Sequence, residues 1–278
     1  MARGARGNTA VTRSTGRGNA GEGGPTPKMK SLKKAIDVLT CFSASQPELG
    51  VTEISERLGI QKSTIHNILA TFEQNGFVEQ DARTRKYRLG LAILSLGNVV
   101  REGLSLRRVA LPVMERARDH FAETVHLAIE QEGFVVYLES VQPADRSVAR
   151  LATGKRAYMH CTGVGKAILA FAPDERVREI VARHGLPRFT DHTITDEIAL
   201  LAELEATRRR GYAVDNMEHE WGIRCVAVPI RSENGRVEAS MSISGPSERF
   251  PLDRIDTLAQ PLVQMGLEVS RRLGWAGY

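Results

Sequence analysis

The sequence has 278 residues, of which 42% are hydrophobic and 26% are charged, and its formal net charge is +5. This length suggests about two domains, with enough apolar residues to bury a core. No apolar run reaches the roughly 18 residues of a membrane span, and three scattered cysteines argue against a disulfide framework and for a reducing, cytoplasmic setting.

The basic excess lies in residues 1–30, which contain six Lys or Arg residues and one Glu, whereas the rest of the chain has 32 residues of each sign. This segment also contains seven glycines and almost no large apolar residue, so we expect a disordered basic tail. It lacks the apolar stretch of a secretory signal. Weak nonspecific affinity for nucleic acid and an inert extension are both compatible with it.

Three short helices are predicted next, and a β-hairpin follows them. Ser31 is expected to cap the first helix, whose apolar residues are Leu32, Ala35, Ile36, Val38, Leu39 and Phe42. Thr52 is placed to cap the second helix, and Gly59 suits the turn after it. The third helix begins near Lys62 and ends at Gly76. Its apolar residues Ile65, Ile68, Leu69 and Phe72 recur at helical spacing.

The other face of the third helix is small, polar and free of acidic residues, so it can enter a DNA major groove and read base edges. The residues expected there are Gln61, Ser63, Thr64, His66 and Asn67, and Lys62 is expected near the DNA backbone. In the hairpin, the basic residues Arg83, Arg85, Lys86 and Arg88 are placed to meet phosphates. Residues 31–90 are therefore predicted to form a winged helix-turn-helix DNA-binding domain. The alternative is a helical module that binds another protein.

Residues 91–103 form a predicted helix with little polar surface. Its apolar residues are Leu91, Ile93, Leu94, Leu96, Val99 and Val100. A helix that is apolar all round is usually buried. We interpret it as a linker helix that packs against a partner subunit, and the alternative is that it belongs to the core of the second domain.

Residues 104–275 alternate between helical and strand patterns. Helices are predicted near 104–122, 164–171, 174–183, 197–210 and 252–272, and strands near 125–129, 134–138, 223–230 and 236–244. An Asn-Gly pair at 234–235 predicts a tight hairpin between the last two strands. Hairpin strands with helices packed around them indicate an α+β domain with an antiparallel sheet.

Two features of this domain suggest a small-molecule pocket. The last strand turns Glu238, Ser240, Ser242 and Ser244 to one face, which is either solvent-exposed or part of a polar pocket. Gly163 and Gly165 precede an apolar helix, whose free N–H groups suit an anion. A nucleotide site is not expected, because a P-loop needs Gly at His160 and Ser or Thr at Ala167. A small organic anion fits better.

Asp215, Glu218, His219 and Glu220 precede the strand that contains Cys225. These residue types can bind a metal or form a Cys/His/Asp catalytic set, but their spacing matches no known ligand pattern. We favour Cys225 as a small apolar residue of the pocket wall. Neither a cofactor nor a metal is therefore expected, and the question of a metal at Asp215, His219 and Cys225 stays open.

The chain resembles the IclR family of bacterial transcriptional regulators from about Ser31 to Leu273. The stretches that carry the resemblance are SLKKAIDVLTCF, LGIQKSTIHNILATFEQNGFVEQD, YRLG, HCTGVGKAILA, RRRGYAVDNMEHEWGIRCVAVPI and SISGPSERF. It implies a winged helix-turn-helix, a linker helix and a GAF-like effector domain with an antiparallel sheet. By position it implies an effector site formed by Gly163, Val164, Asp215, Cys225, Ser242 and Ser244.

The resemblance also implies a ligand-responsive regulator, not an enzyme, and favours a repressor of a catabolic operon. Its expected partners are double-stranded operator DNA, a small organic acid effector and further copies of the chain, in a dimer or tetramer. No association with a membrane is expected. The alternative is a metabolite-binding or metal-dependent catalytic domain, joined to an N-terminal module that recruits another protein.

Overall fold

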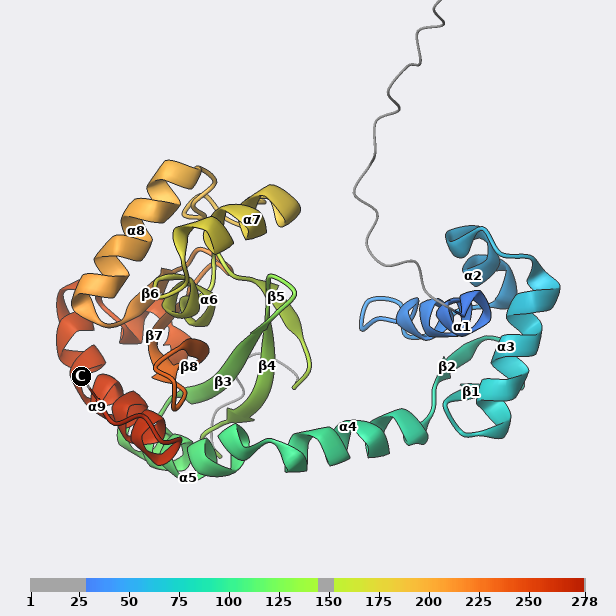
Figure 1. Ribbon diagram of the computed structural model, residues 1–278, viewed down its shortest axis with the longest axis horizontal. Coiled ribbons are helices and arrows are strands. Elements are labelled where there is room, and N and C mark those ends of the chain that lie inside the picture. The colour runs from blue at the N-terminus through green and yellow to red at the C-terminus, as the bar shows by residue number, and fades with distance from the viewer. Residues whose placement is uncertain (1–28, 145–152, 278) are drawn as a thin grey trace, which may run out of the picture. The chain divides into compact units, whose positions relative to one another are not determined.

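The computed structural model describes residues 29–144 and 153–277, and the chain divides after Ser95 into two compact units (Figure 1). Only the last two residues of the predicted tail, 29 and 30, belong to the described part. Within that part, no helix combines the length and the apolar character that a membrane span needs.

The N-terminal unit consists of helices followed by a hairpin. Its elements are α1 (Lys30–Thr40), α2 (Val51–Leu58), α3 (Lys62–Gln74), β1 (Val78–Gln80) and β2 (Tyr87–Leu89). Each of them contributes to one small core, whose buried residues include Val38, Ile54, Ile65, Leu69, Val78 and Tyr87. Leu49 extends the hairpin, because its backbone exchanges hydrogen bonds of 3.0 and 2.8 Å with Tyr87. The predicted winged helix-turn-helix architecture is confirmed.

Two predicted helix caps are wrong. Helix α1 begins at Lys30 after Met29, with no side-chain cap, so Ser31 lies inside the first turn. Helix α2 begins after Gly50, whose N–H donates to Glu53 Oε2 at 2.6 Å. Thr52 therefore lies inside the first turn, and Glu53 caps the backbone N–H of Gly50 instead.

The first helix is also less buried than its apolar pattern suggests. Val38 is fully buried, whereas Leu32 and Ile36 are 54% and 52% exposed. One face of α1 therefore packs on the core and leaves a second apolar stripe at the surface.

Helix α4 (Leu91–Gly103) crosses the division between the two units. Its apolar side chains Leu91, Leu94, Leu96, Val99 and Val100 are all more than half exposed. The alternative interpretation of this helix as core of the second domain is therefore wrong.

The C-terminal unit contains helices on a six-stranded sheet. Its helices are α5 (Ser105–Phe121), α6 (Gly163–Leu169), α7 (Asp174–His184), α8 (Glu197–Arg210) and α9 (Ile255–Arg272). Its strands are β3 (Thr124–Gln131), β4 (Phe134–Val141), β5 (Arg156–Tyr158), β6 (Ala213–Asn216), β7 (Ile223–Arg231) and β8 (Val237–Pro246). The strands β5 and β6 were not predicted. A 3-10 turn over Leu252–Arg254 replaces the predicted start of the last helix.

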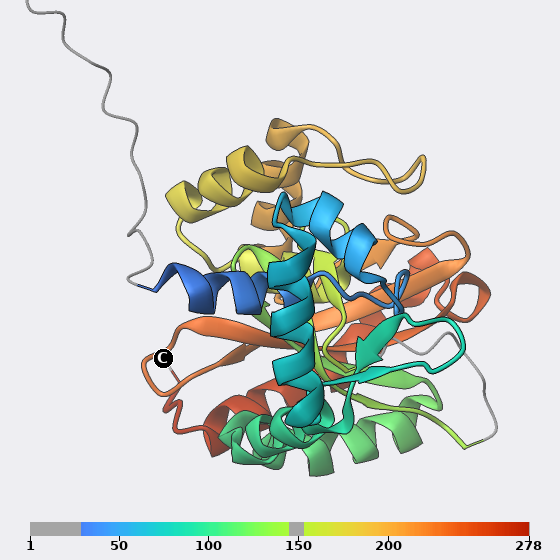
Figure 2. The same ribbon diagram turned by 90° about the vertical axis from the view of Figure 1, so that its right-hand side faces the viewer.

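The sheet is antiparallel throughout, in the order β5-β4-β3-β8-β7-β6, which confirms the predicted α+β class. Figure 2 shows α5 and α9 along one face of the sheet and α6, α7 and α8 over the other. A separate apolar core lies under each helical layer. Between β7 and β8, the predicted tight turn is present, with Gly235 at φ 77°. Both faces of the central strands are therefore buried.

Candidate functional site

The predicted base-reading residues lie at the N-terminal end of α3. Gln61, Lys62, Ser63, His66 and Asn67 are exposed, and Thr64 is half-buried. Ile65 and Leu69 are fully buried in the core of the unit, which directs the opposite side of the helix to solvent. Gly59 ends α2 in the left-handed conformation, with φ 65°, which allows the tight turn into α3. The surface is thus an accessible, acid-free helix face.

Two of the four basic residues of the hairpin form ion pairs. Lys86 Nζ lies 3.1 Å from Glu53 Oε1 at the start of α2, and Arg88 Nη2 lies 2.9 Å from Glu79 Oε2 on β1. The first pair holds the hairpin against α2. Both cations are partly neutralised, so they are less available to phosphates than their sequence positions suggest.

The other two basic residues lie at the tip of the hairpin. Arg83 and Arg85 are exposed and form no ion pair with any described residue. The turn is held by Asp81 Oδ1, which accepts the N–H groups of Arg83 and Thr84 at 3.0 and 2.6 Å. These hydrogen bonds, with that of Thr84 first, lower the pKa of Asp81. The tip therefore presents two unpaired guanidinium groups on a fixed backbone.

The six residues predicted to bind an effector all line one cavity of the C-terminal unit. They are Gly163, Val164, Asp215, Cys225, Ser242 and Ser244. The lining also includes His219 and Glu220, which the sequence analysis considered only for a metal or catalytic site, and four residues that it did not select, His126, Tyr137, Thr162 and Ile223. The cavity measures about 40 Å³. Sites for small molecules usually measure about 300–1,000 Å³, so a ligand of several atoms needs this cavity to widen.

The register of the sheet explains why distant residues meet here. Asp215 pairs with Cys225, and Cys225 pairs with Ser244, which forms one row across β6, β7 and β8. Ser242 lies between Ala227 on β7 and His126 on β3 in the next row of the same face. Cys225 Sγ donates to Ser244 Oγ at 3.0 Å. Two adjacent rows of polar side chains therefore form the floor of the cavity.

The solvent-exposed interpretation of the serine face is wrong. Ser240, Ser242 and Ser244 are 0%, 2% and 6% exposed. Ser240 Oγ donates to the carbonyl of Val228 at 2.9 Å, whereas Ser242 and Ser244 line the cavity. The layer of α6 to α8 buries this face, which the sequence of one strand does not reveal.

The glycine loop lies directly on that floor. A side chain at Gly163 would have its Cβ 3.3 Å from Ala227 Cβ, and a Cβ at Gly165 would lie 2.4 Å from the Met159 backbone. Gly165 therefore needs glycine for this close approach, whereas a side chain at Gly163 would be tightly packed. Thr162 Oγ1 accepts the N–H of Gly165 at 3.2 Å, so that donor is already in use.

The carboxylate of Asp215 is held by backbone N–H groups of the segment that follows β6. Its Oδ1 accepts the N–H groups of Glu218 at 2.7 Å and His219 at 3.4 Å. Burial, with the charge of Glu218 as a smaller cause, raises the pKa of Asp215 to about 7. The positive charge of Lys166 opposes this shift. Its fully buried Nζ lies 2.5 Å from Glu218 Oε1. Near neutral pH, Asp215 is therefore populated both as an acid and as a carboxylate.

His126 and Tyr137 add two neutral polar groups that the sequence analysis missed. Burial lowers the pKa of His126 to about 4 and raises that of Tyr137 above its usual value. Nδ1 of His126 is buried without a hydrogen-bond partner among the described residues. On β3, the alternation of side chains places His126 on the face away from Val125 and Leu127. The sequence does not show that β3 pairs with β8.

The geometry does not favour the catalytic alternative. Burial raises the pKa of Cys225 and of Cys161, so both are thiols and poor nucleophiles. Cys161 Sγ lies 3.7 Å from His219 Nδ1, whereas the Cys225 thiol donates to Ser244. Within residues 29–144 and 153–277, no three His, Cys, Asp or Glu side chains are grouped to hold a metal ion.

Comparison with known proteins identifies the family. The profile of the bacterial transcriptional regulator IclR C-terminal domain matches residues 99–271, and that of the IclR helix-turn-helix domain matches residues 31–82. The chain belongs to the IclR family. It is therefore a transcriptional regulator with a helix-turn-helix DNA-binding domain and a C-terminal effector domain, and the family consists of regulators, not enzymes.

Three relatives illustrate the similarity. The Escherichia coli HTH-type transcriptional regulator XynR is 31% identical over 249 residues, which are 90% of this chain and 99% of XynR. The Escherichia coli transcriptional repressor IclR is 29% identical over 90% of this chain and 92% of its own length. An IclR homologue from Microbacterium hydrocarbonoxydans, crystallised with 4-hydroxybenzoate, is 28% identical, with a TM-score of 0.74 over 88% of this chain and 99% of the homologue.

Proposed function

We propose that this IclR-family regulator binds operator DNA through α3 and the hairpin tip, and that a small organic acid in the cavity of the C-terminal unit changes its affinity for DNA. The observation that carries this proposal is the convergence of Gly163, Val164, Asp215, Cys225, Ser242 and Ser244 on one cavity. The relative crystallised with 4-hydroxybenzoate supports a small organic acid as the ligand.

The chemistry of the cavity suits a carboxylate. The N–H groups of Gly163 and Val164 and the hydroxyls of Ser242 and Ser244 are donors for its oxygens, and Cys225 with Val164 supplies apolar wall. An ionised Asp215 would repel such a ligand, whereas its protonated form can donate to it. A hydroxyl on the ligand gives Asp215 a donor in either state. We therefore favour a hydroxy- or amino-substituted acid.

We further propose that the chain is a repressor of a catabolic operon, acts in the cytoplasm, and self-associates through α4. The repressor named among its relatives supports the first point, and the DNA target supports the second. The apolar surface of α4 supports the third, since soluble proteins rarely expose such a stripe.

The direct test is a fluorescence-anisotropy titration of the full chain with DNA from the region upstream of its own and neighbouring genes. Saturable binding that 4-hydroxybenzoate or another small carboxylate releases is expected. Sequence-independent binding, or no release of DNA by any of the small carboxylates tested, would argue against the proposal.

Asn67→Ala tests the base-reading surface in the same assay. Loss of one base contact typically costs about 1–3 kcal/mol and relaxes specificity at one position. Operator binding should therefore weaken about 5- to 150-fold, while binding to random DNA changes little. An equal loss on both DNAs would remove Asn67 from the readout.

A further inference from the structure

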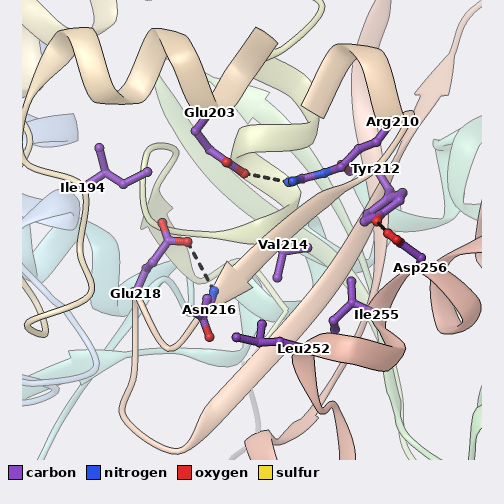
Figure 3. Close-up of a pocket in the computed structure, with 10 residues that line it drawn as sticks. All are labelled: Ile194, Glu203, Arg210, Tyr212, Val214, Asn216, Glu218, Leu252, Ile255 and Asp256. Atoms are coloured by element: carbon purple, nitrogen blue, oxygen red, sulfur yellow. Dashed lines mark hydrogen bonds and ion pairs between the residues drawn. The ribbon is translucent and has the colours of Figure 1, made fainter. Parts of the chain in front are cut away.

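Two of the cavities in the C-terminal unit differ in how their polar side chains are paired. In the cavity of about 360 Å³ beside the edge strand β6, polar side chains bind one another (Figure 3). Glu203 pairs with Arg210, and the Tyr212 hydroxyl donates to Asp256. The proposed effector cavity, in contrast, is lined by three polar side chains for which no described residue supplies a hydrogen bond, Tyr137, His126 and Ser242.

Tyr137 on β4 presents its hydroxyl to the effector cavity. The residue is only 4% exposed, and the hydroxyl forms no hydrogen bond with the described part of the chain. It is not fully enclosed by protein, and the side chain lines the cavity, so the hydroxyl opens into that space. A tyrosine hydroxyl usually finds a partner when it is buried. Its donor and its acceptor are therefore available to a ligand.

His126 on β3 lies beside Tyr137, with ring centroids 5.4 Å apart in an edge-to-face arrangement. Its Nδ1 is fully enclosed whereas Nε2 is not, and neither nitrogen has a partner within residues 29–144 and 153–277. Ser140 lies directly opposite His126 on β4, and its buried hydroxyl is also unpaired, so a small rotation can satisfy Nδ1. Nε2 then remains for a group in the cavity.

The strand order separates this aromatic pair from the end of the cavity beneath α6. A Cβ at Gly163 would lie 3.3 Å from Ala227 Cβ and 3.5 Å from Cys225 Cβ, which places the start of α6 over β7. In the order β4-β3-β8-β7-β6, the strand β8 with its serines lies between β7 and the pair on β3 and β4. Neighbouring strands are about 4.8 Å apart, so roughly 10 Å separate β3 from β7. A ligand can therefore meet the glycine loop with one end and the aromatic pair with the other.

The chemistry of the β3–β4 end suits an uncharged group. Burial lowers the pKa of His126 to about 4, so its ring is neutral at pH 7. The described lining contains no Lys or Arg, so a second carboxylate of the ligand would be buried without a counter-ion. Neither β3 nor β4 contributes a carboxylate to that lining, so an ammonium group lacks its partner there. A hydroxyl both donates and accepts, and it can pair with Tyr137 and with either tautomer of His126.

We propose that Tyr137 and His126 select an effector with a neutral hydroxyl at the end opposite its carboxylate, where that hydroxyl pairs with Tyr137 Oη and His126 Nε2. The inference rests on the proposed effector site and names the ligand class within it, a monocarboxylic acid with a distal hydroxyl. This hydroxyl is separate from any group that meets Asp215. An acid without it leaves both side chains unpaired, which is how a hydrogen-bonding site rejects such an analogue.

The test compares acids that differ by one group, in isothermal titration calorimetry of the full chain at pH 7. The probes are benzoate and butyrate, the 4-hydroxy derivative of each, and the dicarboxylates terephthalate and glutarate. In at least one series, the hydroxylated acid should bind at least tenfold more tightly than its parent and than the dicarboxylate.

Tyr137→Phe and His126→Phe each keep an aromatic ring and remove the hydrogen-bonding group. The fold should tolerate the first change, because the Tyr137 hydroxyl has no partner among the described residues. In both variants, the preference for the hydroxylated acid should fall below threefold while the parent acid binds as in the wild type. Tyr158→Phe, which removes a hydroxyl outside the lining, is the matched control and should keep the wild-type preference.

Two kinds of failure are distinguishable. Equal affinity for each hydroxylated acid and its parent, tighter binding of a dicarboxylate, or a preference that survives Tyr137→Phe or His126→Phe would overturn this inference and leave the proposed effector site standing. Binding of none of the six acids would overturn the proposed site and this inference with it.

Discussion

Asp215 shows how strongly one residue depends on its surroundings in this fold. Its side chain lines the proposed effector cavity, and the residue is 4% exposed. Two backbone N–H groups stabilise its charged form, but burial outweighs them and raises its pKa from 3.8 to about 7. The folded chain therefore holds a proton on Asp215 that the unfolded chain releases at lower pH.

This proton makes the stability of the C-terminal unit depend on pH. Because the folded pKa is raised, the contribution of Asp215 is present in full below pH 4 and is lost as pH rises toward 7, by up to about 1.4 kcal/mol per pH unit. Asp215→Asn should remove this slope. Urea unfolding at pH 5 and pH 7 should show a wild-type loss that exceeds that of the variant by about 1–3 kcal/mol.

Asp253→Asn is the control, since Asp253 is exposed. It should keep the wild-type pH slope. If Asp215→Asn also keeps that slope, Asp215 is ionised throughout this range and its proposed role toward a carboxylate fails.

The hairpin separates basic residues that look alike in the sequence. Arg85 is unpaired at the tip, whereas Arg88 pairs with Glu79 at 2.9 Å. A cation that displaces counter-ions from DNA contributes about 0.9 to the slope of log K against log salt. Arg85→Ala should reduce the slope of operator binding by about this amount, and Arg88→Ala by clearly less. Equal effects of the two variants, in titrations from low to moderate salt, would contradict this distinction.

At the scale of elements, the sequence pattern was informative wherever a regular apolar repeat faced one core. The stripe of α3, the strands β7 and β8 and the hairpin at Gly235 were predictable for this reason. The caps at Ser31 and Thr52 were not, because a neighbouring Glu53 or a bare backbone can start a helix equally well. The edge strands β5 and β6 span only three and four residues, too few for a recognisable alternation.

Helix α4 has a surface that its own chain does not cover. Val99 and Val100 are 69% and 64% exposed, beside the exposed leucines 91, 94 and 96. If α4 packs against a second copy, Val99→Glu places a charge in that interface. Its dissociation constant, measured by sedimentation equilibrium, should rise at least tenfold, because burying a Val contributes about 1.5–3 kcal/mol.

Ile198→Glu is the matched control, at an exposed apolar position on α8 and outside α4. It should leave self-association unchanged. A Val99→Glu chain that sediments like the wild type would show that α4 is not the contact.

At the scale of the whole molecule, function depends on residues that are far apart in the chain. Ser242 and Ser244 were predictable from the alternation of their strand, whereas Asp215 and Cys225 were placed at the site by the family resemblance alone. His126 and Tyr137 were not, because only the order β4-β3-β8-β7-β6 brings their strands to the same cavity. A small cavity of about 40 Å³ that must widen for a ligand also gives binding a way to favour one conformation over another.

We propose that a ligand in this cavity sets the affinity of the chain for DNA. This coupling is measured by the operator dissociation constant with and without the releasing acid, for the wild type and for the double variant Ser242→Ala and Ser244→Ala. Without acid the two chains should bind equally. With acid the wild type should weaken by about 5- to 150-fold, as for a coupling of 1–3 kcal/mol, and the variant should not change. A variant that still releases DNA at the same acid concentration would contradict the claim.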